Sequence, residues 1–173
     1  MMPHKITPEE YHRMGPIFLD ARLELIRGEL FNMAPIGISH FWTVTQLDRW
    51  LNRRLADRAL VVCQGPLALP DSEPQPDLMV LRLEDYRRRL PEPADVLWLI
   101  EVADTSISHD RTRKLPLYAR HGIPEVWLID LNTRVAEVHR QPDGEVYRLV
   151  TRPNPLSPQD FPDLILPLEE ILP

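Results

Sequence analysis

The sequence predicts an α/β protein, α+β-like in character, in which helices flank a mixed central β-sheet behind an N-terminal hairpin. Residues 96–102 form an almost unbroken apolar run, which is typical of a central strand buried on both faces. Residues 39–57 carry apolar side chains at three- and four-residue steps, as an amphipathic helix does. The predicted order is helix, hairpin, helix, several strands, helix and further strands, which favours helices packed on a mixed sheet.

The first third of the chain carries the clearest signals for helix ends and turns. Thr7 and Pro8 are suited to the N-cap and first position of a helix, and two acidic residues follow in its first turn. Residues 23–33 hold two short apolar pieces around Arg27-Gly28 and predict a hairpin. Ser39 is a possible N-cap for the long helix. The predicted apolar stripe of that helix comprises Phe41, Val44, Leu47, Leu51 and Leu55.

The remainder of the chain alternates short strands with polar connections. The predicted strands cover residues 60–63, 67–69, 78–81, 96–102 and 126–129. Residues 135–139 and 146–150 alternate around Pro142-Asp143-Gly144, which indicates a second hairpin. Helical turns are expected at 84–90 and a helix at 115–121, with a polar loop at 104–114. The proline-rich tail from Leu156 is expected to wrap the surface.

Composition narrows the class of protein. A chain of 173 residues fits one domain, so we expect a single domain over 1–173. The apolar runs are too short for a bilayer, residues 1–14 lack the apolar region of a signal peptide, and Cys63 is the only cysteine. These observations favour a cytoplasmic protein. The formal net charge of −6 argues against a general nucleic-acid coat protein, but an active site that binds metal needs carboxylates.

Glu101 is the strongest single indication of a functional site. It lies near the end of the apolar run 96–102 and shares a strand face with Leu97 and Leu99. A buried, unpaired carboxylate costs several kcal/mol, so Glu101 needs a cation, a set of donors or a cleft. A metal ion is one answer. The other is that the strand emerges from the core here and Glu101 is solvated.

Asp77 and Lys114 are weaker candidates when each is taken alone. Asp77 follows Pro76 at the start of the strand 78–81, where it could lie beside Glu101 and share a Mg²⁺ ion with it. Pro-Asp is also a common turn opener. Lys114 begins the helix that follows the polar loop, and a lysine beside a metal-held phosphate would stabilise negative charge. It could equally be a solvated charge at a helix end.

A resemblance to a known family strengthens these candidates. The segment from Glu101 to Asp130 resembles the Uma family of putative restriction endonucleases, which belongs to the PD-(D/E)XK nuclease superfamily. The N-terminal part also fits: residues 24–30, Met33-Ala34-Pro35, His40 at the opening of the long helix, and Pro76-Asp77. The resemblance covers almost the whole chain and implies a restriction-endonuclease-like core.

The resemblance also implies roles for individual residues. The superfamily pattern has an acid, one residue and a lysine, but here Ala103 stands two residues after Glu101. The lysine role then falls to Lys114, with Asp110 and Arg113 near enough to share it. Glu24 is an additional acid beside the metal, or a half-exposed hairpin carboxylate. His40 contacts phosphate or metal-bound water, or it caps its own helix.

The expected activity is hydrolysis of DNA phosphodiester bonds by a metal-dependent endonuclease. Asp77 and Glu101 would bind Mg²⁺ or Mn²⁺, with the Ala103 carbonyl as a further ligand and Lys114 assisting. The alternative is a catalytically silent protein of the nuclease fold that binds nucleic acid or protein. A homodimer is possible. Arginines that could face phosphate, or that simply belong to solvated loops, are Arg87, Arg88, Arg89, Arg111, Arg113 and Arg120.

Overall fold

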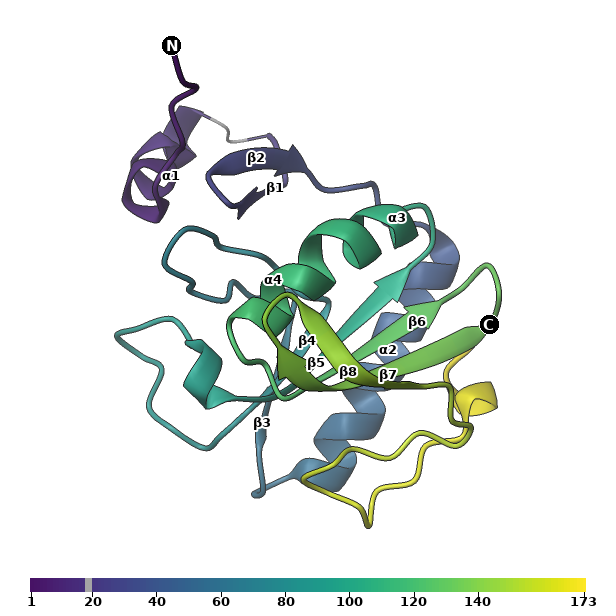
Figure 1. Ribbon diagram of the computed structural model, residues 1–173. Helices are drawn as coiled ribbons and strands as arrows, with labels where there is room; N and C mark the ends of the chain where they lie inside the picture. The colour runs from purple at the N-terminus through teal and green to yellow at the C-terminus, as the bar shows by residue number, and fades with distance from the viewer. Residues whose placement is uncertain (18–19) are drawn as a thin grey trace.

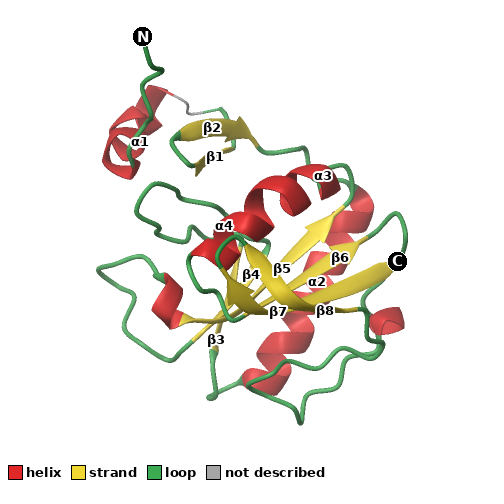
Figure 2. Cartoon of the chain, in the orientation of Figure 1, coloured by secondary structure: helices red, strands yellow, loops and turns green. Residues whose placement is uncertain are grey.

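The computed structural model describes residues 1–17 and 20–173 and confirms the predicted α/β class. A six-stranded mixed sheet forms the centre, with the long helix α2 on one face (Figures 1 and 2). The helical segment that contains α3 and α4 covers the other face, and the N-terminal hairpin lies beyond it. The α-helices are α1 (Pro8–Met14), α2 (Ile38–Leu55), α3 (Ile107–His109) and α4 (Leu115–Arg120).

The described residues form eight strands. They are β1 (Leu23–Ile26), β2 (Glu29–Asn32), β3 (Leu60–Cys63), β4 (Leu78–Leu81), β5 (Val96–Ala103), β6 (Glu125–Asp130), β7 (Val135–Asp143) and β8 (Val146–Thr151). β1 and β2 form the N-terminal hairpin, and the other six strands run in sequence order across the sheet. Among the strands of residues 1–17 and 20–173, only β5 and β6 pair in parallel, because the helical segment between them provides the crossover that parallel strands need.

Each face of the sheet has its own hydrophobic core. The first packs α2 on the sheet face that carries Trp98, Ile100 and Val102. The second packs α4 on the face that carries Leu99 and Ala103. Burying both faces of β5 explains its almost uninterrupted apolar sequence. Glu101 lies on the face of Leu99 and Ala103, so α4 and the segment before it cover that carboxylate.

The ends of the N-terminal elements follow from local chemistry. A capping box between Thr7 and Glu10 starts α1, as the sequence predicts. Arg27 and Gly28 both adopt positive φ angles of 50° and 76° in the predicted hairpin turn. Helix α2 begins two residues before the prediction, with Gly37 at the N-cap, so Ser39 lies in the first turn instead of capping it.

Two predictions about exposed and buried segments are wrong. Phe41 is 60% exposed, although Val44, Leu47, Leu51 and Leu55 are buried as predicted. The stripe curves around α2, and Phe41 falls at its outer edge. The C-terminal tail does more than wrap the surface, because Leu156, Leu164, Leu166, Leu168 and Ile171 complete the first core.

The segment 104–114 is helical from Ile107 onward, not a loop as predicted. α3 leads through a π-helical turn, Asp110–Lys114, directly into α4. Pro116 explains the irregular turn, because it lacks an N–H group and its ring would clash with the carbonyl four residues earlier in a regular α-helix. This turn brings both Asp110 and Lys114 into the buried part of the structure.

Two further predictions of secondary structure are also wrong. Residues 67–69 form no strand, although Leu69 makes an isolated bridge to Ser72. Residues 84–90 form irregular backbone with bends and no helix, and Asp85 pairs with Arg87 there. Within the described parts of the chain, no helix combines the length and the apolar character needed to cross a membrane.

Candidate active site

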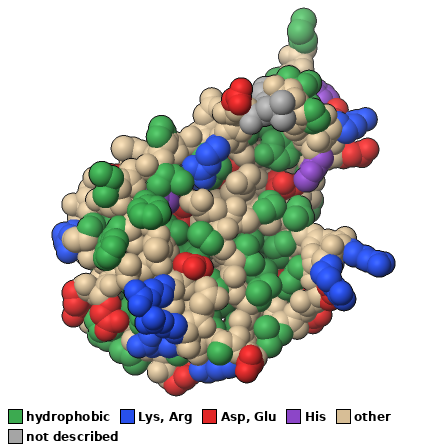
Figure 3. All heavy atoms as spheres, turned by 180° about the vertical axis from the view of Figure 1, so that it is seen from behind, with side chains coloured by type: hydrophobic (Ala, Val, Ile, Leu, Met, Phe, Trp, Pro, Cys, Tyr) green, Lys and Arg blue, Asp and Glu red, His purple; other side chains and the backbone are tan. Residues whose placement is uncertain are grey.

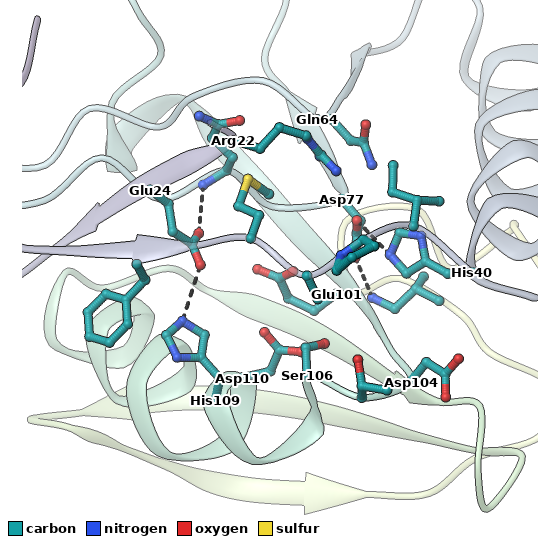
Figure 4. A pocket seen from close by; sticks show the side chains of 18 of the residues that line it. Arg22, Glu24, His40, Gln64, Asp77, Glu101, Asp104, Ser106, His109 and Asp110 are labelled. Atoms are coloured by element: carbon teal, nitrogen blue, oxygen red, sulfur yellow. Dashed lines mark hydrogen bonds and ion pairs between the residues drawn. The ribbon is translucent and has the colours of Figure 1, made fainter. Parts of the chain in front are cut away.

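A cavity of about 340 Å³ opens where the ends of β4 and β5 meet the start of α2 (Figure 4). Its walls come from four separate parts of the sequence: the N-terminal hairpin, the first turn of α2, the strand ends and the helical segment after β5. Five of the sequence-predicted residues line this cavity: Glu24, His40, Asp77, Glu101 and Lys114. The fold therefore brings together residues that lie up to 90 positions apart in the sequence.

Asp77 is held in place from two sides. Its Oδ2 accepts a hydrogen bond of 2.8 Å from the backbone N–H of Val102 in β5, and its Oδ1 lies 3.0 Å from Nε2 of His40. The hydrogen bond to Asp77 raises the pKa of His40 above its usual range, against the opposing effect of burial. The antiparallel register that pairs Leu78 with Ile100 places Asp77 next to Glu101 across the ladder.

Glu101 is buried, with 3% of its surface exposed, and is paired on the α4 side. Its carboxylate accepts hydrogen bonds of 3.2 and 3.4 Å from Nζ of Lys114, and a shorter one of 2.5 Å from the hydroxyl of Tyr118. The alternative of a simply solvated Glu101 therefore does not hold. Burial raises the pKa of Glu101 well above its usual range; Lys114 opposes this shift, and Asp110 and Asp77 add to it.

Lys114 connects the strand carboxylate to the hairpin. Its Nζ lies 3.1 Å from Oε2 of Glu24, 3.2 Å from Oε1 of Glu101 and 4.0 Å from Oδ1 of Asp110. Burial would lower the pKa of Lys114, but the attraction of Glu101, Glu24 and Asp110 outweighs it and raises that pKa. Lys114 therefore keeps its positive charge at neutral pH and cannot serve as a general base.

Glu24 is a buried member of this cluster and not the half-exposed hairpin carboxylate of the alternative reading. Besides Lys114, its Oε1 lies 3.1 Å from Nε2 of His109, and its Oε2 accepts from the backbone N–H of Gln75. Burial would raise the pKa of Glu24, but His109 and Lys114 together hold it below its usual range. The hairpin is thus tied to the helical segment through the site.

The balance of charge in the cavity favours a cation. Five carboxylates line it, those of Glu24, Asp77, Glu101, Asp104 and Asp110, against the two cations Arg22 and Lys114, and Lys114 is the lysine that pairs with Glu24, Glu101 and Asp110. Burial also raises the pKa of Asp110, with Asp77 adding to the effect. Carboxylate oxygens are the ligands that Mg²⁺ prefers. The residues present therefore fit a divalent cation.

The protein ligands for such an ion would be few. Among the described residues, no three His, Cys, Asp or Glu side chains converge closely enough to enclose an ion on their own. Mg²⁺ commonly uses one or two protein carboxylates and completes its shell with water and phosphate. Asp77 and Glu101, adjacent across the β4–β5 ladder, match that requirement and leave ligand positions open for a substrate.

The structure does not bring every expected residue to the cavity. The Ala103 carbonyl accepts a hydrogen bond of 2.9 Å from the N–H of Leu131, and Val102, not Ala103, lines the cavity. None of the arginines expected to face phosphate lines it either. Five of them meet other groups: Arg87 pairs with Asp85, Arg89 with Asp95, Arg111 with Glu137 and Arg120 with Asp71, and Arg113 lies over the Phe31 ring.

Sequence reasoning missed two contributors to the site and gave a third another role. His109 pairs with Glu24, and Tyr118 donates to Glu101 instead of serving only as core; Asp110, which was expected to share the role of the lysine, belongs to the carboxylate cluster. The helical spacing of Asp110, Lys114 and Tyr118 at four-residue steps could have indicated both Asp110 and Tyr118. That pattern was hidden because residues 104–114 were expected to form a loop.

The sheet order, the crossover helix and the carboxylate-lined cavity define a nuclease-like α/β protein. The fold is shared with a crystal structure described as a putative nuclease belonging to DUF820 from Anabaena variabilis, with a TM-score of 0.76, 16% identity, and coverage of 96% of this chain and 97% of that one. A family model described as putative restriction endonuclease, Uma2, matches residues 8–169. The chain belongs to the Uma2 family, which confirms the resemblance. No curated protein matches it.

Proposed function

We propose that this protein is a metal-dependent endonuclease that hydrolyses DNA phosphodiester bonds, acting as one nuclease-like domain over residues 1–173. One observation carries the proposal: Nζ of Lys114 lies between the carboxylates of Glu24 and Glu101, in a cavity that Asp77 also lines. Membership of the Uma2 family supports the nuclease class. The cofactor, the substrate and the residue roles rest on the chemistry of the cavity.

Asp77 and Glu101 would hold Mg²⁺ or Mn²⁺ at the ends of β4 and β5. The backbone N–H of Val102 fixes one oxygen of Asp77, and Tyr118 and Lys114 fix Glu101, so both carboxylates are oriented before an ion binds. When bound, the ion lowers the pKa of a water ligand and offsets the charge of the scissile phosphate.

Lys114 and His40 act on the charge of the substrate. Lys114 is buried and stays protonated, so it can stabilise the negative charge that develops on phosphate oxygens. Glu24 holds the lysine from the hairpin side, and His109 in α3 holds Glu24, so both act as positioning residues. His40 lines the cavity from the first turn of α2, and its contact with Asp77 favours the protonated ring that a phosphate would attract.

The test is cleavage of supercoiled plasmid, linear duplex and single-stranded DNA in Mg²⁺ or Mn²⁺, with EDTA as a blank. Asp77→Asn and Glu101→Gln are expected to lower the rate by at least about 10³-fold, the upper range for losing one group that stabilises the transition state. Glu84→Gln changes an exposed carboxylate outside the cavity and should cleave like the wild type.

Two outcomes would overturn the proposal. Equal cleavage by wild type, Asp77→Asn and Glu101→Gln would mean that the activity comes from a contaminant. No cleavage of any substrate by the wild type, together with metal-independent binding of DNA or protein, would favour the catalytically silent module instead.

A further inference from the structure

The outward face of α2 carries large apolar side chains where a solvent-exposed helix normally carries polar ones. Ile38 is 89% exposed, Phe41 60% and Trp42 46%. Ile36, just before the helix, is 46% exposed and also lines the cavity. We call these four residues the apolar lip. It lies at the end of α2 that borders the candidate active site, and exposed apolar patches of this kind mark binding surfaces.

Arginines continue the same face away from the cavity. Arg49 and Arg53 follow Trp42 by seven and eleven residues, spacings that keep all three on one side of a helix. Arg49, Arg53 and Arg54, with Trp50 and Glu170, line a second hollow of about 280 Å³. Figure 3, which views the molecule from behind, shows hydrophobic side chains gathered beside a group of Lys and Arg side chains.

These arginines are available to an external anion. None of the ion pairs formed within residues 1–17 and 20–173 involves Arg49, Arg53 or Arg54. In contrast, Arg58, three residues after the end of α2, pairs with Asp163 through two hydrogen bonds. Arg54 lies over the ring of Trp50, which leaves Arg49 and Arg53 as the two arginines on this face without a partner among the described residues, in a chain whose formal net charge is −6.

We propose that this face of α2 binds a single strand of nucleic acid that enters or leaves the cavity. Bases stack on Phe41 and Trp42, and phosphates contact Arg49 and Arg53, a combination that suits unpaired strands because every base offers a flat face. The track from Trp42 to Arg53 is about 16 Å long at the helical rise of 1.5 Å per residue. The inference rests on the proposed nuclease function and adds the form of substrate that the site receives.

A second copy of the chain fits this face less well. A two-fold interface presents the same patch from both subunits, so it would gather the arginines of both copies on one buried surface. Glu170 is the one carboxylate among the residues that line the second hollow, and buried charges without partners are costly. A phosphate backbone supplies the negative charge that such an interface lacks.

The experiment measures binding of fluorescein-labelled dT12 by anisotropy in EDTA, where no cleavage takes place, with U12 and a 12-base-pair duplex as further probes. The double variant Phe41→Ala/Trp42→Ala should weaken dT12 binding by at least about 5-fold, the low end for loss of base stacking. Its affinity for the duplex should stay within a factor of two or so of the wild type, because paired bases offer no free face.

The arginines give a separate readout. Arg49→Ala/Arg53→Ala should reduce the slope of log affinity against log salt by about 1.4, since each phosphate contact on a single strand contributes about 0.7. Leu83→Ala and Arg148→Ala are matched controls, because both residues are exposed and line neither hollow. U12 shows whether the track distinguishes RNA from DNA.

Three results would overturn the inference: no dT12 binding by the wild type, unchanged affinity and salt slope in both double variants, or a wild-type dimer that Phe41→Ala/Trp42→Ala converts to a monomer without affecting dT12. The last result would assign the face to self-association. If the wild type binds dT12 through α2 but cleaves nothing in Mg²⁺ or Mn²⁺, the proposed activity fails and the binding track stands.

Discussion

Two buried glutamates on neighbouring strands, Glu101 in β5 and Glu125 in β6, have opposite surroundings. Glu125 is 2% exposed and accepts hydrogen bonds from Nε and Nη2 of Arg140, from Nε1 of Trp127 and from the backbone N–H of Gln159. Its charge is matched by one arginine. Glu101 shares one lysine with Glu24 and Asp110 and lines a cavity.

The difference separates a structural carboxylate from one suited to chemistry. Burial by itself does not distinguish them, because both side chains are almost fully covered. The useful measure is the ratio of local cations to carboxylates and the presence of open space. The charge of Glu125 is balanced by Arg140 and its oxygens accept hydrogen bonds, whereas the cluster around Glu101 has an excess of negative charge that a divalent ion would neutralise.

The largest effect on stability is expected from Lys114→Met. This change removes the cation shared by Glu24 and Glu101, and loss of one partner from a buried ion pair typically costs about 3–5 kcal/mol. We expect a loss of about 4 kcal/mol in the free energy of unfolding at pH 8, measured with urea in EDTA. The loss should shrink toward pH 5, where the carboxylates can take up protons. An equal loss of stability at both pH values would show that the negative charge of these carboxylates is not the cause of the loss.

Arg140→Ala tests the structural glutamate. It leaves Glu125 buried without a cation, and we expect a loss of about 3 kcal/mol, at the low end of the range because Arg140 is 25% exposed. The cleavage rate per folded molecule should not change. Arg148→Ala is the control, because its ion pair with Asp143 is exposed and should contribute less than about 1 kcal/mol. A loss of cleavage in Arg140→Ala that exceeds its loss of folded protein would contradict the division between the two glutamates.

A divalent ion should stabilise the wild type and not the site variants. At an ion concentration one hundred times the dissociation constant, the gain in unfolding free energy is about 2.7 kcal/mol. The measurement is the thermal midpoint in Mg²⁺, Mn²⁺ or Ca²⁺ against EDTA. Asp77→Asn and Glu101→Gln should lose the shift, while Glu84→Gln should keep it. A shift of full size in Glu101→Gln would remove Glu101 from the ligand set.

Glu101 also makes stability depend on pH in the absence of metal. The pKa of Glu101 is raised in the folded state, so that state binds the proton more tightly than the unfolded chain does. The contribution of Glu101 to stability is therefore present below its ordinary pKa of about 4.3 and is lost as pH rises toward the folded-state value.

Glu101→Gln removes this loss. The variant should gain stability relative to the wild type between pH 5 and pH 8, by at most about 1.4 kcal/mol per pH unit. Urea unfolding at pH 5, 6, 7 and 8 in EDTA measures the difference. A gap between the two proteins that stays constant or narrows with rising pH would show that Glu101 is not destabilised by its charge.

The sequence was sufficient for the fold class and for much of the cavity. Periodicity and turn residues predicted both hairpins, α2 and β5, because each is specified by local pattern. Glu101 could be singled out because an acid on an apolar strand face demands an explanation. The prediction that Glu24 and His40 belong to the site came from the family resemblance. These residues lie far from Glu101 and Lys114 in the sequence and meet them only through the tertiary fold.

The failure at residues 104–114 has a clear physical source. Residues 104–114 are polar and precede Pro116, which favours a loop on local grounds, but packing on the sheet and a π-turn make them helical. Their helical spacing then places Asp110 and Tyr118 at the site. Phe41 fits the apolar period of α2 but falls at the outer edge of the buried stripe, where it stays 60% exposed.

Ala103 has a consequence for how such a site can be altered. It is fully buried on the same strand face as Glu101, beneath the helical segment that carries Lys114. A lysine at position 103, two residues after the acid, would need the volume that this segment occupies. Ala103 and Lys114 therefore depend on each other. Placing the lysine at position 103 of the strand would require Ala103, Lys114 and the helix above them to change together.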